Sequence, residues 1–109
     1  MKTNINKVEL SGYAGMDIRV REFKNGSKMA CFSLSTHESY KNKEGAGVST
    51  TTWHHIVLWN EQAERAEKAV RKGLPVVITG KLRYRCYQTQ AGEKKCVAEI
   101  VADKLDLAA

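Results

Sequence analysis

The chain has 109 residues, 42% of them hydrophobic, which suffices for one folded domain with a single core. Lysine and arginine number 18 against 12 aspartate and glutamate, and the net charge of +6 favours a polyanionic partner. No apolar run reaches the roughly 20 residues of a membrane-spanning helix, and the first residues lack the apolar stretch of a secretion signal. We therefore expect a cytoplasmic protein.

Apolar and polar residues alternate in the first part of the chain, which indicates strands. A long, bent first strand is predicted from Val8 to the turn at 24–27, with the bend at its glycines. A second strand is predicted from Lys28 to about Ser39. The residues that we expect it to turn inward are Ala30, Phe32 and Leu34. The polar, glycine-rich segment 40–47 is predicted to be a mobile loop with the ring of Tyr40 at its base.

The third predicted strand, 50–59, carries two tryptophans on one face. Strand alternation groups the side chains of Trp53, His55, Val57 and Trp59 on one side. The opposite side, with Ile56 and Leu58, is also largely apolar, so the indoles could be core residues, which is the commoner place for large aromatics. Alternatively, they could lie on the surface as rings that stack on unpaired bases. His54 is expected to be a hydrogen-bonded core histidine.

A short helix is predicted after this strand, with Asn60 as its N-cap and Gly73 at its end. Three glutamates each lie four residues before a lysine or arginine, so we expect the helix charges to pair with one another. These pairs are Glu61 with Arg65, Glu64 with Lys68, and Glu67 with Arg71. A narrow stripe of small apolar residues, Ala63, Ala66 and Val70, should rest against the end of a barrel. Pro75 marks the start of the next strand.

Two further strands, Val76 to Tyr87 and about Lys95 to Leu107, are predicted to form a hairpin. Alternation predicts an inner face made of Val76, Ile78, Gly80, Leu82, Tyr84 and Cys86. It predicts an outer face made of Lys81, Arg83, Arg85 and Tyr87. Alternating charges are often only the solvated side of a sheet. Together with the tryptophan strand, however, they favour a surface where bases stack on rings and phosphates neutralise cations.

The three cysteines, Cys31, Cys86 and Cys96, have no spacing typical of a zinc site, and we expect reduced thiols in a reducing compartment. If the last hairpin is symmetric about Ala91, Cys86 and Cys96 become cross-strand neighbours that could be bridged under oxidising conditions. The sequence also lacks a phosphate-binding glycine loop and a cluster of carboxylates that could hold a metal. We therefore expect no enzyme, no cofactor and no metal site.

The predicted order is three strands, a helix and two strands. An antiparallel five-stranded set with its helix between the third and fourth strands has the order of the OB-fold, a small barrel whose exposed face binds oligonucleotides. We expect this all-β domain with one short helix to span residues 1–107. Residues 108–109 would then be a short carboxyl-terminal end.

Short motifs spread along most of the chain form a recognisable pattern. They are Asn6-Lys7-Val8, Gly12, Gly15, Asp17, Asn25-Gly26, Phe32-Ser33-Leu34, Trp53-His54, Ala63-Glu64, Lys72-Gly73, Gly80-Lys81-Leu82 and Glu99-Ile100-Val101. With these motifs the chain resembles the bacterial single-stranded DNA-binding protein family. The resemblance implies an OB barrel that forms a homotetramer or a dimer. It also implies sequence-independent binding of single-stranded DNA in replication, recombination and repair, near the nucleoid.

The resemblance also implies the residues that bind. The family's four base-stacking positions fall here on Tyr40, Trp53, Trp59 and Tyr87. The expected phosphate contacts are Lys81, Arg83, Arg85 and His55, with weaker contributions from Lys41, Lys43, Lys94 and Lys95. The first strand would be an unprotected edge in an isolated barrel, which also favours pairing with a second copy.

This sequence departs from the family pattern in several places. Tyr40 and Tyr87 stand where tryptophan is more familiar, and His55 replaces a permanent cation, so binding there should depend on pH. The sequence ends at 106–109 without the flexible linker and acidic tip that recruit repair and replication enzymes, so such recruitment is not expected. A primosomal restart protein of the same fold, acting mainly through protein contacts, is the alternative. Its sparser aromatic surface makes it the weaker one.

Overall fold

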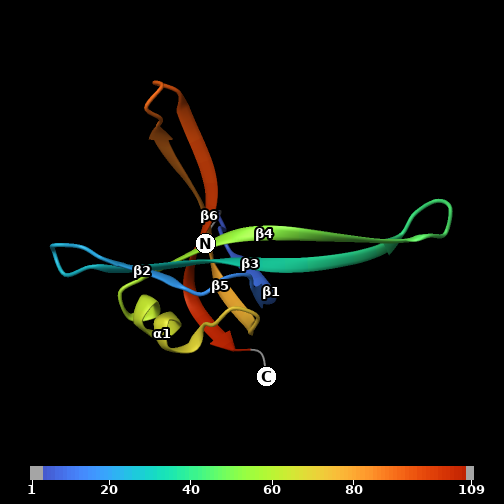
Figure 1. Cartoon of the computed structure of the whole chain (residues 1–109), viewed down its shortest axis with the longest axis horizontal. Coiled ribbons are helices and arrows are strands. Elements are labelled where there is room, and N and C mark those ends of the chain that lie inside the picture. Colours follow the sequence, from blue (N-terminus) through green and yellow to red (C-terminus); the bar gives the residue numbers. More distant parts are fainter. Residues whose placement is uncertain (1–3, 108–109) are drawn as a thin grey trace.

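A computed structural model describes residues 4–107, which fold into a barrel with projecting hairpins (Figure 1). The expected short end at 108–109 lies outside the described residues. The elements in chain order are β1 (Val8–Ala14), β2 (Arg19–Glu22), β3 (Lys28–Lys41), β4 (Gly47–Trp59), α1 (Glu61–Ala69), β5 (Pro75–Gln88) and β6 (Lys94–Leu107).

Five strands close the barrel. The sheet order is β1-β5-β6-β4-β3-β2, and the additional pairing of β1 with β3 closes the ring, with β2 paired to β3 outside it. All pairings are antiparallel except that of β4 with β6, where Ile56 lies opposite Ile100. The predicted single bent first strand is wrong in one respect, because it is divided into β1 and β2, which both pair with β3. The five-stranded OB architecture is confirmed.

The barrel interior is filled by aliphatic side chains and one phenyl ring. Its fully buried large residues are Phe32, Leu34, Ile56, Leu58, Val70, Val76, Ile78 and Leu105. At Gly80 the neighbouring strand comes so close that an added Cβ would lie 2.1 Å from the carbonyl oxygen of Val101. A glycine is required there because β5 and β6 shift register at this point. The predicted inner face is therefore correct as far as Gly80.

Beyond Gly80 the predicted inner face is wrong. Leu82, Tyr84 and Cys86 are exposed, because the outer halves of β5 and β6 leave the barrel as a hairpin with no core beneath it (Figure 1). The same alternation continues, but it no longer separates a core from solvent. A period of two reports the direction of a side chain and not what covers it.

The predicted loop at 40–47 is also wrong. β3 and β4 pair without a break from Met29 opposite Trp59 to Lys41 opposite Gly47, so only residues 42–46 form a turn. Figure 1 shows this long hairpin extending away from the barrel in a different direction from the β5–β6 hairpin. The three threonines at 50–52 supply the strand propensity that the nearby glycines obscured.

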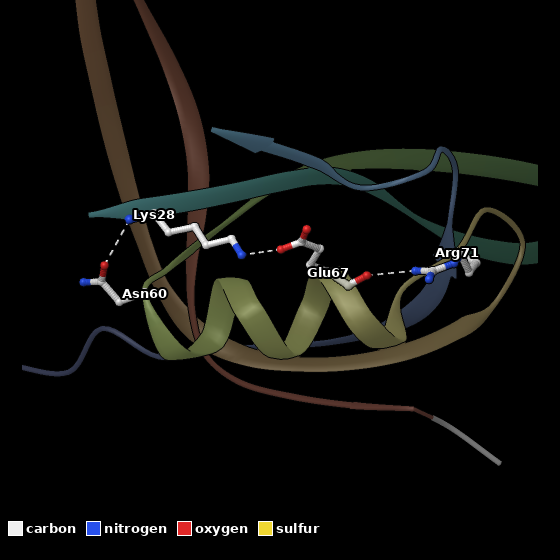
Figure 2. A network of polar contacts seen from close by, with 4 residues as sticks. All are labelled: Lys28, Asn60, Glu67 and Arg71. Atoms are coloured by element: carbon white, nitrogen blue, oxygen red, sulfur yellow. Dashed lines mark hydrogen bonds and ion pairs between the residues drawn. The ribbon is translucent and has the colours of Figure 1, made fainter. Parts of the chain in front are cut away.

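The helix packs on β3, β4 and β6 through its small-residue stripe, as predicted, with Ala63, Ala66 and Val70 fully buried. Asn60 is the N-cap residue, as predicted, but its side chain makes no capping hydrogen bond. Its Oδ1 instead accepts a hydrogen bond from the Lys28 backbone N–H at 3.1 Å (Figure 2). The helix ends at Ala69, before the predicted stop at Gly73.

Charged groups of the helix pair with other elements and not with one another. Glu67 forms an ion pair with Lys28 of β3 (Figure 2). Arg65 pairs with Asp106 of β6 at 3.1 Å. Among the residues that the structure describes, none of the three predicted helix pairs is formed. Arg71 instead donates to the backbone carbonyl oxygen of Glu67 at 2.9 Å. Neighbouring strands offer these side chains partners that outcompete weak contacts along the helix.

Candidate nucleic-acid interface

The outer face of β4 carries both indoles on the surface. The exposed fraction is 60% for Trp53 and 37% for Trp59, whereas Val57 between them is buried. The surface interpretation of the two tryptophans is therefore the one that the structure shows. On the other face, the Nε2 of His54 lies 2.9 Å from Thr36 Oγ1, so the predicted hydrogen bond is present, but His54 is half-buried and not the core residue that was predicted.

Trp53 owes its position to a glycine on the neighbouring loop. A Cβ added at Gly15 would lie 2.1 Å from Cζ3 and 2.8 Å from Cη2 of the indole, so the ring lies directly against the Gly15 backbone. That backbone is fixed in turn, because the Gly15 N–H donates to the carbonyl oxygen of Ser33 at 2.7 Å. The indole is thus supported from below, and more than half of its surface stays accessible.

Trp59 belongs to an aromatic pair. Its ring stacks on Phe23 with centroids 5.9 Å apart and an interplanar angle of 23°. The guanidinium carbon of Arg21 lies 5.3 Å from the centroid of Phe23, within the range of a cation–π contact. β2 and the turn after it therefore add a ring and a cation to the face of β4.

A groove of about 410 Å³ runs over these residues. It is lined by Arg21, Phe23, Met29, Cys31, His55, Val57, Trp59, Arg83, Arg85 and Glu99. Four residues predicted to bind nucleic acid meet here: His55, Trp59, Arg83 and Arg85. An aromatic floor with cations along its wall suits one or more nucleotides, with base on ring and phosphate on guanidinium.

Glu99 is a feature of the groove that the sequence analysis did not anticipate. Its side chain is almost fully buried, and its carboxylate oxygens lie 4.0 Å from Arg83 Nε and 3.5 Å from Arg85 Nε. The two arginines, predicted to lie on the outer face, therefore also have a carboxylate partner. The buried carboxylate removes part of their charge and holds both guanidinium groups at the groove wall, with the pairing made through Nε.

The other predicted residues of the β5–β6 hairpin lie outside the groove. Lys81 is exposed at the base of the hairpin, and Lys94 and Lys95 lie near its tip. Tyr87 pairs across the strands with Lys95, and the Arg85 guanidinium lies 5.8 Å from its ring centroid. The hairpin therefore extends a line of cations that ends at the ring of Tyr87 away from the barrel.

Tyr40, Lys41 and Lys43 lie at the far end of the β3–β4 hairpin. Tyr40 is 55% exposed and lies opposite Val48, whereas Trp53 lies opposite Ser35. Because side chains alternate along a strand, this register places Tyr40 on the opposite face of the hairpin from Trp53. The structure thus does not gather the four predicted stacking residues on one face.

Two of the groove residues missed by the sequence analysis had a signal in the sequence. Arg21 and Phe23 stand at alternate positions to Ile18 and Val20, so strand alternation places their side chains on the other, outward face. Alternation across the β5–β6 hairpin would also have placed Glu99 beside Arg83, because the two residues lie directly opposite each other.

The redox state of the hairpin cysteines also differs from the expectation of free thiols. Cys86 lies opposite Cys96 in a hairpin symmetric about Ala91, and the two are joined by a disulfide. The bridged alternative left open by the sequence is thus the one observed. Cys31, in the groove, is free.

Comparison with known proteins places this architecture in a family. The sequence profile described as "Single-strand binding protein family" matches residues 5–108. The chain belongs to this family. Its members are defined by binding and not by a catalysed reaction, and on this ground the prediction that the chain is not an enzyme is confirmed.

Relatives of the family support the same assignment. The chain is 38% identical over 106 residues to the single-stranded DNA-binding protein of Bacteroides thetaiotaomicron. The alignment covers 95% of this chain and 66% of that relative, so the chain spans just under two thirds of the relative's length.

Solved structures of family members have the same fold. The Plasmodium falciparum SSB in complex with ssDNA superposes with a TM-score of 0.85 at 31% identity, covering 99% of this chain and 96% of that one. A deletion mutant of the Thermus aquaticus single-stranded DNA-binding protein also gives 0.85, at 24% identity, with 96% of this chain and 51% of that chain covered.

Within residues 4–107, no helix is long and apolar enough to cross a membrane. The same residues contain no group of three or more histidine, cysteine or acidic side chains arranged to hold a metal ion.

Proposed function

We propose that this protein binds single-stranded DNA without sequence preference and protects it during replication, recombination and repair. Bases stack on Tyr40, Trp53, Trp59 and Tyr87, and Phe23 extends the stacking surface. Phosphates are neutralised by Lys81, Arg83, Arg85, His55 and Arg21, with Lys41, Lys43, Lys94 and Lys95 contributing at the hairpin tips. Support comes from family membership and from the similarity to a relative solved with ssDNA.

The observation that carries the proposal is the exposure of both indoles beside a cation-lined groove. An indole with one face on the protein and the other open to solvent can accept any base, because every base has a π face. Guanidinium groups that are already held in place lose little freedom on binding a phosphate. Neither contact reads a base edge, so the proposed binding is independent of sequence.

A titration with labelled oligo(dT), followed by anisotropy, tests the proposal. Trp53→Ala and Trp59→Ala should each weaken binding by about 1–3 kcal/mol, roughly fivefold to 150-fold, because each loses a stacked base. Duplex DNA of equal length should bind much more weakly than oligo(dT), since its bases are not free to stack.

Tyr84→Ala is the matched control, because Tyr84 is 66% exposed on the β5–β6 hairpin and is not part of the proposed surface. It should bind oligo(dT) like the unmodified chain. If both tryptophan variants bound as tightly as this control, the stacking assignment would be wrong. A chain that bound no oligo(dT) but captured protein partners would favour the restart-type alternative.

We also propose that the protein is a homo-oligomer, either a tetramer or a dimer. Among the described residues, Val8–Gly12 of β1 pairs with β5 along one edge only, since the contact of β1 with β3 is limited to Tyr13 and Ala14. Unpaired backbone N–H and C=O groups along the other edge favour pairing with a second copy. Light scattering at micromolar concentration should give a mass above that of one chain, and a strict monomer would contradict the proposal.

A further inference from the structure

The outer half of the β5–β6 hairpin has no core to hold it. Residues 81–88 of β5 and 94–96 of β6 are all exposed, although the strands stay paired as far as Gln88 opposite Lys94. An isolated two-stranded hairpin is only marginally stable in water. The order of this segment therefore depends on links between its two strands.

The disulfide between Cys86 and Cys96 is such a link. The two residues lie directly opposite each other with Cα atoms 4.0 Å apart, and both are exposed. Solvent thiols can therefore reach the bond. By strand alternation the sulfur atoms lie on the hairpin face opposite to Arg85 and Tyr87, so the bond can open without a direct contact to the proposed DNA surface.

We propose that Cys86 and Cys96 form a thiol–disulfide exchange site that controls the affinity for single-stranded DNA. This inference rests on the proposed function. Cys86 is flanked in sequence by two proposed DNA contacts, Arg85 and Tyr87. With the bond closed, both side chains are held on an ordered hairpin; with the bond open, the hairpin frays and the two contacts lose their fixed spacing.

The partner in the exchange is a dithiol reductant. One of its thiolates attacks a protein sulfur, the Cys86–Cys96 bond breaks, and a mixed disulfide forms. The second thiolate of the reductant then displaces the protein sulfur. Two electrons pass to the protein, both cysteine sulfurs end as thiols after taking up protons, and the reductant leaves as its own disulfide.

Reduction should weaken the binding of oligo(dT) about threefold to tenfold, because ordering the hairpin then opposes binding. Trp59 and the other groove residues on β2, β3 and β4 do not belong to this hairpin, so binding should be weakened and not abolished. Hydrogen exchange gives a second readout. Amides of residues 83–97 should exchange faster after reduction, whereas amides of the buried part of β3 should not change.

The experiment compares the air-oxidised chain with the same chain treated with dithiothreitol, each titrated with labelled oligo(dT). Alkylation and mass spectrometry establish the state of each cysteine. The double variant Cys86→Ser with Cys96→Ser should bind like the reduced chain and should not respond to the reductant. Cys31→Ser keeps the pair but alters a groove residue, so its affinity before reduction is measured separately; reduction should then change its affinity by the same factor as that of the unmodified chain.

Equal or tighter binding by the reduced chain would overturn the inference. It would also fail if the double variant still responded to reductant, or if the bond did not form in air. Failure of the proposed function is distinguishable, because neither redox state would then bind oligo(dT). Hydrogen exchange on the unmodified chain tests the order of the hairpin even if the double variant folds poorly.

Discussion

The position of the Trp53 ring, a proposed DNA contact, depends on the backbone of one neighbouring residue, Gly15. Because the indole lies against the Gly15 backbone, Gly15→Ala should displace the ring, whose Cζ3 would be 2.1 Å from the new Cβ. We expect oligo(dT) binding to weaken by up to the value of one stacked base, about 1–3 kcal/mol. Trp fluorescence of the free variant should also change, and anisotropy titration measures the affinity.

Gly47→Ala is the control for this substitution. No atom lies within 4 Å of a Cβ added at Gly47, and its φ is not positive, so the added methyl group meets open space. That variant should bind normally. If Gly15→Ala shifted the fluorescence but left the affinity unchanged, Trp53 would not be a stacking residue.

The face on which most outer side chains lie could be predicted from the alternation within each strand, whereas the charged groups that surround them could not. Alternation correctly grouped Trp53 with Trp59 on one face of their strand and Phe32 with the inward residues, although it left open whether the indoles were exposed. Alternation within one strand did not show that Glu99 pairs with two arginines, because that contact also requires the register between β5 and β6. Strand register is determined by the hairpin turn and not by the alternation within one strand.

The Lys28–Glu67 ion pair joins the helix α1 to strand β3 of the barrel. The hydrogen bond with the Glu67 carboxylate raises the pKa of Lys28 above its ordinary value. The pair therefore stabilises the fold at neutral pH, and the stabilisation is lost as the pH rises through the folded-state pKa of Lys28.

Lys28→Met should accordingly be less stable than the unmodified chain at pH 7, with a difference that shrinks at strongly alkaline pH. Urea midpoints measured for both proteins across the alkaline range test this. Lys68→Met on α1 provides the control, since Lys68 takes part in no ion pair between described residues. A difference that stayed constant with pH would show that Lys28 acts through its aliphatic stem alone.

The elements themselves were largely predictable, and the errors have a common cause. Strand and helix positions follow from local periodicity and turn residues, which is why α1 and the start of β5 at Pro75 were anticipated. The β3–β4 hairpin was missed beyond Ser39 because glycines at 45 and 47 look like a loop. They instead lie at or beside a tight turn, and tertiary pairing over the whole length overrides the local signal.

For the whole molecule, the net charge of +6 predicts a salt-dependent affinity for a polyanion. The logarithm of the affinity should fall with the logarithm of the salt concentration by about 0.7 per phosphate neutralised on a single strand. Lys81→Ala should reduce that slope by about 0.7, because it removes one proposed phosphate contact. Titrations of oligo(dT) at several salt concentrations measure the slope.

Lys68→Ala lowers the net charge by the same amount but lies on α1, away from the proposed surface. Its slope should match that of the unmodified chain. Equal slopes for the Lys81 and Lys68 variants would mean that only overall charge matters and that Lys81 contacts no phosphate.

The two faces of the β3–β4 hairpin have a consequence for the shape of the bound polymer. A nucleic acid that contacts Trp53 on one face and Tyr40 on the other must turn around the edge of a ribbon only two strands wide. Duplex DNA, with a persistence length of about 150 base pairs, is too stiff to follow such a path. A flexible single strand can follow this path. The stiffness of duplex DNA alone would therefore exclude it, independently of base stacking.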